Sequence, residues 1–138
     1  MPPSKAGAER ELRALADRYG PENVFVELTD HQMPGDDDRN DLVADLAART
    51  GLTIVASTAA HHASPAQARL AQALAALRQN RSLGEAEAYL AAAGTAHLRY
   101  PAEMTRRLAP WPGVQQNTVD LARACAFDFR TLNPEMPG

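Results

Sequence analysis

Cysteine, aromatic side chains and long apolar runs are all scarce in this 138-residue chain. The single cysteine, Cys125, excludes an internal disulfide and is typical of a reducing compartment. No apolar run approaches the roughly 20 residues that a transmembrane helix needs. The first residues, Met1–Lys5, lack the apolar segment of a secretory signal. These absences predict a cytoplasmic protein with no membrane partner.

The composition is that of one ordinary globular domain, or of a piece of a larger one. Apolar residues make up 45% of the chain, charged residues 22% and aromatic residues only 5%. The core must therefore be built from leucine, valine and alanine, and alanine buries little area. The net charge of −3 disfavours an autonomous nucleic-acid-binding domain, which is usually basic.

Two short apolar runs, at residues 24–28 and 52–56, predict strands on either side of a helix over residues 36–50. Strands joined in this way are parallel, and the crossover between them is right-handed. Further helices are expected at residues 9–19, from Pro65 onward, and at residues 82–90, 101–108 and 113–125. The expected fold class is α/β, with an α/β part at residues 1–80 and a helical part at residues 81–138. Two strands cannot close a barrel, so the α/β part resembles a piece of a larger sheet.

The candidate site combines Asp30 and His31 with His61 and His62, because each pair follows the end of a predicted strand. Parallel strands end at one edge of a sheet, where chemistry usually takes place. Imidazole and carboxylate groups are ligands for zinc, manganese or iron, and Glu27 on the first strand could join them. The alternative is that these histidines are ordinary polar loop residues. Glu27 is expected either to pair with an arginine or to face a polar barrel interior.

Other polar residues are interpreted structurally. The acidic run at residues 36–38 is expected to cap a helix rather than bind a cation. His97 and Trp111 are expected to pack between helices, and Cys125 to be a small buried apolar residue on a helix. Four arginines are expected on solvated helix faces rather than at a phosphate: Arg78, Arg81, Arg106 and Arg107.

Two sequence blocks resemble a known family. The first contains VELTDH at residues 26–31, RNDLVADLAARTGL at residues 39–52 and VASTAAHH at residues 55–62; the second runs from His97 to Phe129. Both are similar to the polymerase-and-histidinol-phosphatase (PHP) domain of C-family bacterial DNA polymerases, and to the exit helices that lead toward the palm. The error-prone branch of that family is the most similar. The likeness runs from about Glu9 to Pro137 and implies a partial PHP-type fold, a distorted, TIM-like βα barrel.

The resemblance implies specific roles and specific losses. Metal-binding members end the second strand in Asp-x-His, so His61 keeps a ligand position whereas Ala59 replaces the aspartate. His62 stands where tyrosine is common, and Ala71 replaces a histidine of the next helix. His31 and His62 are weaker metal candidates than His61. The family's His-x-His motif would precede this segment and the polymerase palm would follow it, so no catalytic residue is expected within it.

The expected function is that of a fragment of an error-prone, translesion DNA polymerase whose PHP region is mainly structural. The resemblance implies DNA, deoxynucleotides and Mg²⁺ for the full-length nucleotidyltransferase, and no nucleic-acid site in this segment. One retained imidazole is expected not to hold Zn²⁺ or Mn²⁺ in this fragment. Two rival interpretations are a free-standing, metal-dependent PHP phosphoesterase, which would use His31, His61 and His62, and a non-catalytic interaction module.

Overall fold

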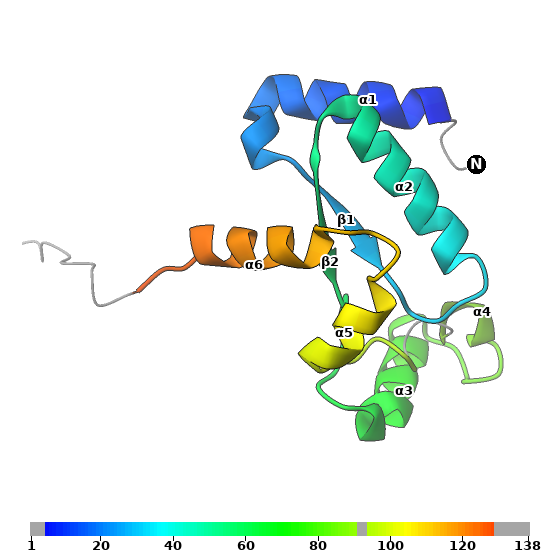
Figure 1. Cartoon of the computed structure of the whole chain (residues 1–138). Coiled ribbons are helices and arrows are strands. Elements are labelled where there is room, and N and C mark those ends of the chain that lie inside the picture. The colour runs from blue at the N-terminus through cyan, green and yellow to red at the C-terminus, as the bar shows by residue number, and fades with distance from the viewer. Residues whose placement is uncertain (1–4, 91–93, 129–138) are drawn as a thin grey trace, which may run out of the picture.

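The structure, a computed structural model, describes residues 5–90 and 94–128 and places a βαβ unit at its centre (Figure 1). Strands β1 (Phe25–Thr29) and β2 (Thr53–Ser57) pair in parallel, with Phe25 opposite Thr53 and Thr29 opposite Ser57. Each strand begins one residue later than the sequence predicts. The helices are α1 (Lys5–Tyr19), α2 (Asp36–Thr50), α3 (Ala68–Arg78), α4 (Glu87–Leu90), α5 (Pro101–Arg107) and α6 (Val114–Ala124), with 3-10 turns η1 (Pro21–Asn23) and η2 (Pro65–Gln67).

Local sequence signals explain where several elements begin and end. Gly51 ends α2 in the left-handed conformation, at φ 71°, and its amide bonds back to the last turn. Pro65 opens η2, and the side chain of Gln67 accepts hydrogen bonds from the Ala63 and Ser64 amides at 2.9 and 3.3 Å. The helix expected at residues 82–90 is shorter in the structure, since α4 begins at Glu87.

Helix α6 closes the outer edge of β2. The Asn117 side chain donates to the Ile54 carbonyl at 3.0 Å, and the Thr118 hydroxyl accepts from the Ala56 amide at 2.9 Å. Two side chains of one helix thus satisfy the backbone groups that a further strand would otherwise use. Among the described residues, no side chain bonds in this way to the outer edge of β1 over Phe25–Leu28, so the sheet is open on that side only.

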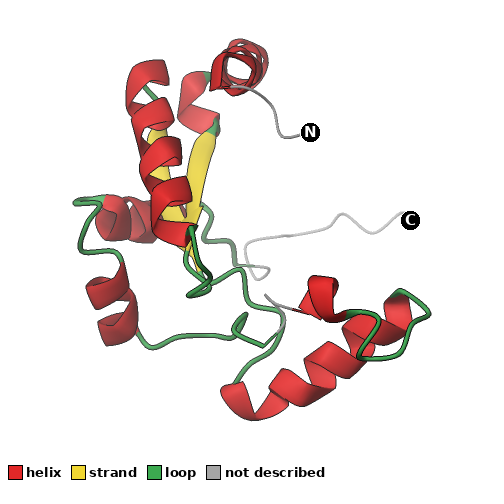
Figure 2. Cartoon of the chain, turned by 90° about the vertical axis from the view of Figure 1, so that its right-hand side faces the viewer, coloured by secondary structure: helices red, strands yellow, loops and turns green. Residues whose placement is uncertain are grey.

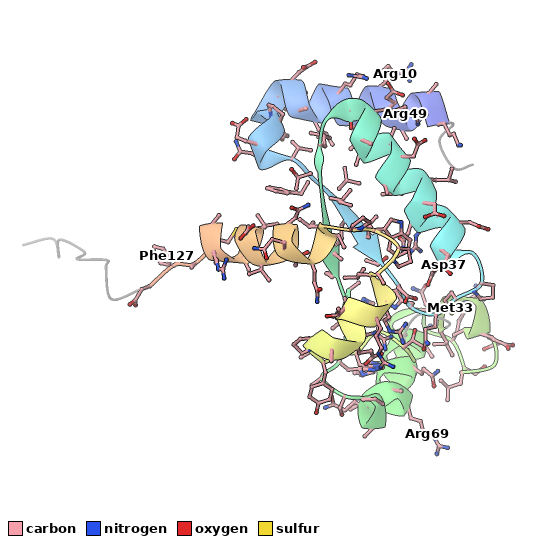
Figure 3. The ribbon with its side chains drawn as sticks, viewed as in Figure 1. Arg10, Met33, Asp37, Arg49, Arg69 and Phe127 are labelled. Atoms are coloured by element: carbon pink, nitrogen blue, oxygen red, sulfur yellow. The ribbon has the colours of Figure 1, made fainter. Side chains whose placement is uncertain are left out.

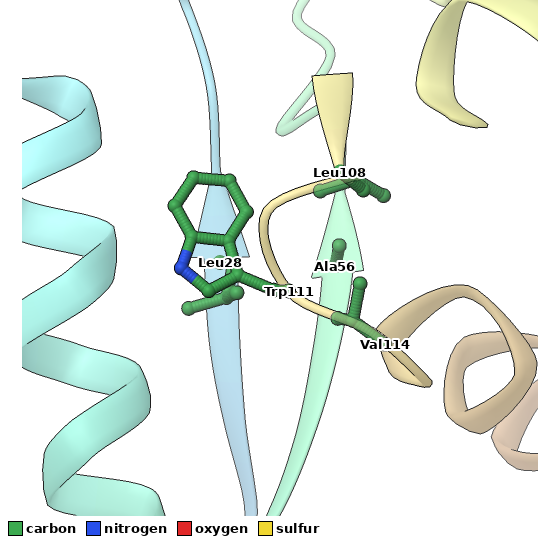
Figure 4. Close-up of a cluster of buried hydrophobic side chains, with 5 residues drawn as sticks. All are labelled: Leu28, Ala56, Leu108, Trp111 and Val114. Atoms are coloured by element: carbon green, nitrogen blue, oxygen red, sulfur yellow. The ribbon is translucent and has the colours of Figure 1, made fainter. Parts of the chain in front are cut away.

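The core is small and joins the two halves of the sequence. Leu28 and Ala56 of the sheet pack against Leu108 and Trp111 of the turn after α5, and against Val114 at the start of α6 (Figure 4). A second cluster lies at the other end of the strands and joins Val24 and Val26 to Ala47 and Leu52. Trp111 is buried as expected, and its indole N–H donates to Asp41 at 2.9 Å. Cys125 is exposed at the end of α6, so the expectation that it is buried was wrong.

Helices α3 and α4 stand apart from the sheet, at the far end of the molecule from α1 (Figure 2). Helix α3 contacts mainly α4 and η2, and its one buried residue is Ala76. Within residues 5–90 and 94–128, no helix is long and apolar enough to cross a membrane. The boundary between residues 80 and 81 and the PHP-type barrel remain predictions.

Candidate functional site

Asp30 follows β1 directly and anchors a loop at the carboxyl edge of the sheet. One of its carboxylate oxygens accepts a hydrogen bond from the Gln32 amide at 2.7 Å. The other accepts from Nη1 of Arg107, also at 2.7 Å, across 77 residues of sequence. This contact ties the end of the first strand to α5.

Arg107 belongs to a chain of four alternating charges. Its Nε donates to Oε1 of Glu103 at 2.9 Å, and the same oxygen accepts from Nη1 of Arg99 at 2.8 Å. The side chains of Arg99 and Arg107 are only 3% and 14% exposed, so most of their surface is out of water. The expectation that Arg107 lies on a solvated helix face was therefore wrong, because Asp30 and Glu103 draw its guanidinium inward.

The charge chain shifts the pKa values of its acids. Partial burial alone would raise the pKa of Asp30, but hydrogen bonds from Arg107 and the Gln32 amide, together with the positive charge of Arg107, hold it below its ordinary value. The pKa of Glu103 is lowered against the same burial effect by its hydrogen bonds to Arg107 and Arg99. Both carboxylates are therefore ionised at neutral pH and bind the two guanidinium groups.

The segments around His62 and His97 meet beside this chain. The amides of His61 and His62 both donate to the Ala96 carbonyl, at 2.7 and 3.2 Å, and the Leu98 amide donates to the His62 carbonyl at 3.3 Å. The His62 and His97 rings lie 5.8 Å apart, and Nδ1 of His62 is 2.8 Å from the Ser64 carbonyl. Partial burial, followed by the charges of Arg99 and His62, lowers the pKa of His97 and favours its neutral form.

The acidic start of α2 shapes the loop around His31. The N-cap of α2 is Gly35, in the left-handed conformation at φ 87°, so the expected aspartate cap was wrong. Asp36 is instead the first helical residue and is buried, and its Oδ2 accepts hydrogen bonds from the His31 and Met33 amides at 2.8 and 3.0 Å. Arg39 pairs with the other oxygen of Asp36 at 3.0 Å. The carboxylate therefore orders the β1–α2 loop rather than its own helix.

The side chains of the described residues do not fit the divalent-metal site that the family resemblance suggests. Among residues 5–90 and 94–128, no three His, Cys, Asp or Glu side chains come close enough together to hold an ion. His61 is exposed, whereas His31 is half-buried and held through its backbone amide. Glu27 is exposed on β1 and, within the described part of the chain, pairs with no arginine. A ligand role for His61 remains a prediction.

An open cleft of about 890 Å³ lies between the β1–α2 loop and α5. Figure 3 labels Met33 and Asp37 on the loop side, and Arg106 and Arg107 contribute from α5. Five carboxylates and two arginines line the cleft. The carboxylates are those of Asp30, Asp36, Asp37, Asp38 and Glu103. This negative balance disfavours a phosphate or a nucleic-acid backbone as an occupant of the cleft.

Arg99, Glu103 and Arg107 were not predicted from the sequence as a group. Their spacing of four residues, with alternating sign, is the pattern of charges that meet along one side of a helix. The pattern begins at Arg99, two residues before the helix starts at Pro101. It can therefore be recognised in the sequence only if the expected helix is extended backward. The pairing with Asp30 had no local signal.

This chain is similar to curated proteins from several bacteria. No protein-family model matches the chain. Several of these relatives are named error-prone DNA polymerase. The protein of Nocardia farcinica is 52% identical over 130 residues, covering 94% of this chain and 11% of the relative. The protein of Mycobacterium tuberculosis is 46% identical over 132 residues, and that of Cutibacterium acnes is 45% identical over 130 residues.

The chain is thus homologous to one segment of the error-prone DNA polymerases and spans about 11–12% of their length. Identity of this degree over nearly the whole chain confirms the resemblance to error-prone polymerases that the sequence blocks predict. The assignment of the segment to a PHP domain is a separate matter and remains a prediction.

Proposed function

We propose that this chain is a structural segment of an error-prone DNA polymerase, from the distal part of its PHP domain and the exit helices. The observation that carries this proposal is the 52% identity to such a polymerase over 94% of the chain. Within the polymerase, the segment links the end of a PHP strand to the helices that lead toward the palm.

The structural role is supported by the contacts that join distant parts of the chain. Asp30 and Arg107 connect the strand end to α5, and Asn117 and Thr118 fix α6 along β2. Each of these contacts joins positions more than 60 residues apart and uses a side chain that is at least partly buried.

The longer polymerase would supply the chemistry. As a nucleotidyltransferase that copies damaged templates, it would bind DNA and deoxynucleotides and use Mg²⁺ in a palm formed by other residues. The enzyme would act in the cytoplasm, where bacterial DNA is copied.

The first experiment is to sequence the locus on both sides of this segment. We expect the reading frame to continue upstream into a His-x-His motif and downstream into a palm with paired carboxylates. Stop codons on both sides, with a promoter of its own, would overturn the proposal for this product.

A second experiment separates a structural role from a catalytic one. In the longer protein, Arg107→Ala is expected to lower the melting temperature while the extension rate per folded molecule on a primed template stays unchanged. A drop in that rate, with the melting temperature unaffected, would show that the segment takes part in catalysis instead.

A further inference from the structure

Helix α3 turns its bulky residues outward and its small residues inward. Leu70, Leu74 and Leu77 lie at i, i+4 and i+7, on one side of the helix, and are 60%, 50% and 71% exposed. The opposite side packs through alanine, with Ala76 of α3 and Ala86 of the next turn almost fully buried. If this side of the helix faced only solvent, three leucines there would contribute nothing to the stability of the fold.

The end of this leucine face is positively charged. Helix α3 carries no acidic residue, Arg78 is its last residue, and Arg81 follows in the next turn. Neither arginine pairs with a carboxylate among the described residues. Leu83, two residues after Arg81 in the chain, is also 53% exposed. The surface therefore has an apolar centre and a basic border.

The exposed area of the leucine face (Leu70, Leu74 and Leu77) indicates whether its partner is a second copy of the chain or another part of the same polypeptide. A leucine side chain offers roughly 100 Å², so three that are 50–71% exposed present roughly 200 Å². A stable complex of two separate proteins buries about 800 Å² on each partner. A surface this small holds a partner only when the two belong to one polypeptide, because tethering makes the association intramolecular.

We infer that the leucine face of α3 is an intramolecular docking surface for another part of the same polymerase polypeptide. This inference rests on the proposed function. The relatives of this chain are about nine times longer than the region they share with it, so most of their polypeptide lies outside the segment. The docked part presents an apolar surface with an acidic side chain at its border, opposite Arg78 and Arg81.

The test places a photo-cross-linking amino acid, p-benzoylphenylalanine, at position 74 of the longer protein. The matched control places it at position 69. Arg69 is on the same helix but about 100° around it from Leu70, and Figure 3 shows it pointing outward into solvent. We expect position 74 to cross-link within the polypeptide, to residues outside this segment, at least tenfold more than position 69. Mass spectrometry identifies the partner peptide.

Several outcomes would overturn the inference. A cross-link from position 74 to a second copy or to bound primed DNA would assign the face to another partner. Equal cross-linking at positions 74 and 69 would show that nothing covers it. If the longer polymerase is active, any of these results leaves the proposed function intact. A reading frame that ends at the borders of the segment would instead contradict both the proposed function and this inference.

A second measurement addresses the energetic role of the face. Leu74→Asp in the longer protein is expected to lower the melting temperature by several degrees more than Arg69→Asp does. In the isolated 138-residue chain, where the face is already in water, the two substitutions should have equal effects. Equal effects in the longer protein as well would contradict docking at this face.

Discussion

At the scale of single residues, Arg107 decides how the two halves of the sequence meet. It contacts Asp30 after β1 and Glu103 within α5, and its side chain is 14% exposed. An arginine with five donors in a planar fork can serve two carboxylates at once, which a lysine cannot do with the same geometry. Its neighbour Arg106 is exposed and lines the cleft.

Replacing Arg107 is therefore expected to destabilise the fold. Arg107→Ala leaves the Asp30 and Glu103 carboxylates without their shared partner, at a cost of about 1–2 kcal/mol in the free energy of unfolding. Urea denaturation followed by circular dichroism measures the change. The matched control is Arg106→Ala, which should stay within about 0.5 kcal/mol of the wild type because that side chain is exposed. Equal losses in the two variants would contradict the role given to Arg107.

The lowered pKa of Asp30 predicts how the stability of the fold changes as the pH falls. A carboxyl whose pKa is lower in the folded state stabilises the fold at neutral pH, and this contribution is lost as the pH falls through the lowered pKa. For an aspartate this loss takes place below about pH 4. Asp30→Asn, which cannot ionise, should be less stable at pH 7 and lose less stability between pH 5 and pH 3. Parallel stability curves for the two proteins over that interval would be evidence against the pairing.

At the scale of elements, the contact between α6 and β2 controls where the sheet ends. The hydroxyl of Thr118 accepts from the Ala56 amide, and the same hydroxyl donates to Val114 within its helix at 2.8 Å. One side chain thus connects a helix to the outer edge of a strand 62 residues earlier in the chain. The arrangement protects that edge from pairing with another strand.

Removing the hydroxyl tests this edge directly. Thr118→Val keeps the shape of the side chain but leaves the Ala56 amide without a partner, which costs about 1–3 kcal/mol for a buried donor. Hydrogen exchange measured by NMR should show faster exchange at the Ala56 amide, and Thr118→Ser should restore slow exchange. Unchanged protection of that amide in Thr118→Val would mean that another group holds the edge.

Elements defined by local signals were predicted well, and contacts over long distances were not. The apolar runs of β1 and β2, the glycine after α2 and the proline at η2 each act within a few residues, so the sequence alone locates them to within one residue or so. The aspartate cap failed because Asp36 bonds to the loop before it instead. The pair of Asp30 and Arg107 depends on how α5 returns to the sheet, which no local pattern specifies.

At the scale of the whole molecule, the described residues form a fold that is incomplete in two places. The outer edge of β1 carries no partner over Phe25–Leu28 in the described part of the chain, and the leucine face of α3 is exposed. A two-stranded parallel sheet is seldom stable alone, because parallel sheets are normally covered on both faces and extended by further strands. Both features agree with a segment that folds within a longer polypeptide.

The isolated 138-residue chain should consequently be a weakly stable protein. Its core depends on few large side chains, so we expect a broad thermal transition with a midpoint below about 45 °C, the lower end of the usual range for mesophilic domains. Exposed apolar surface should also bind the dye ANS before unfolding. Differential scanning calorimetry and dye binding measure these two properties, and sizing on a column shows whether the chain is a monomer. A sharp, cooperative transition well above that temperature, in a monomer that binds no dye, would show that the segment is complete by itself. In that case the open edge of β1 and the leucines of α3 would be tolerated features of a free-standing domain, and the case for a structural segment would rest on sequence identity alone.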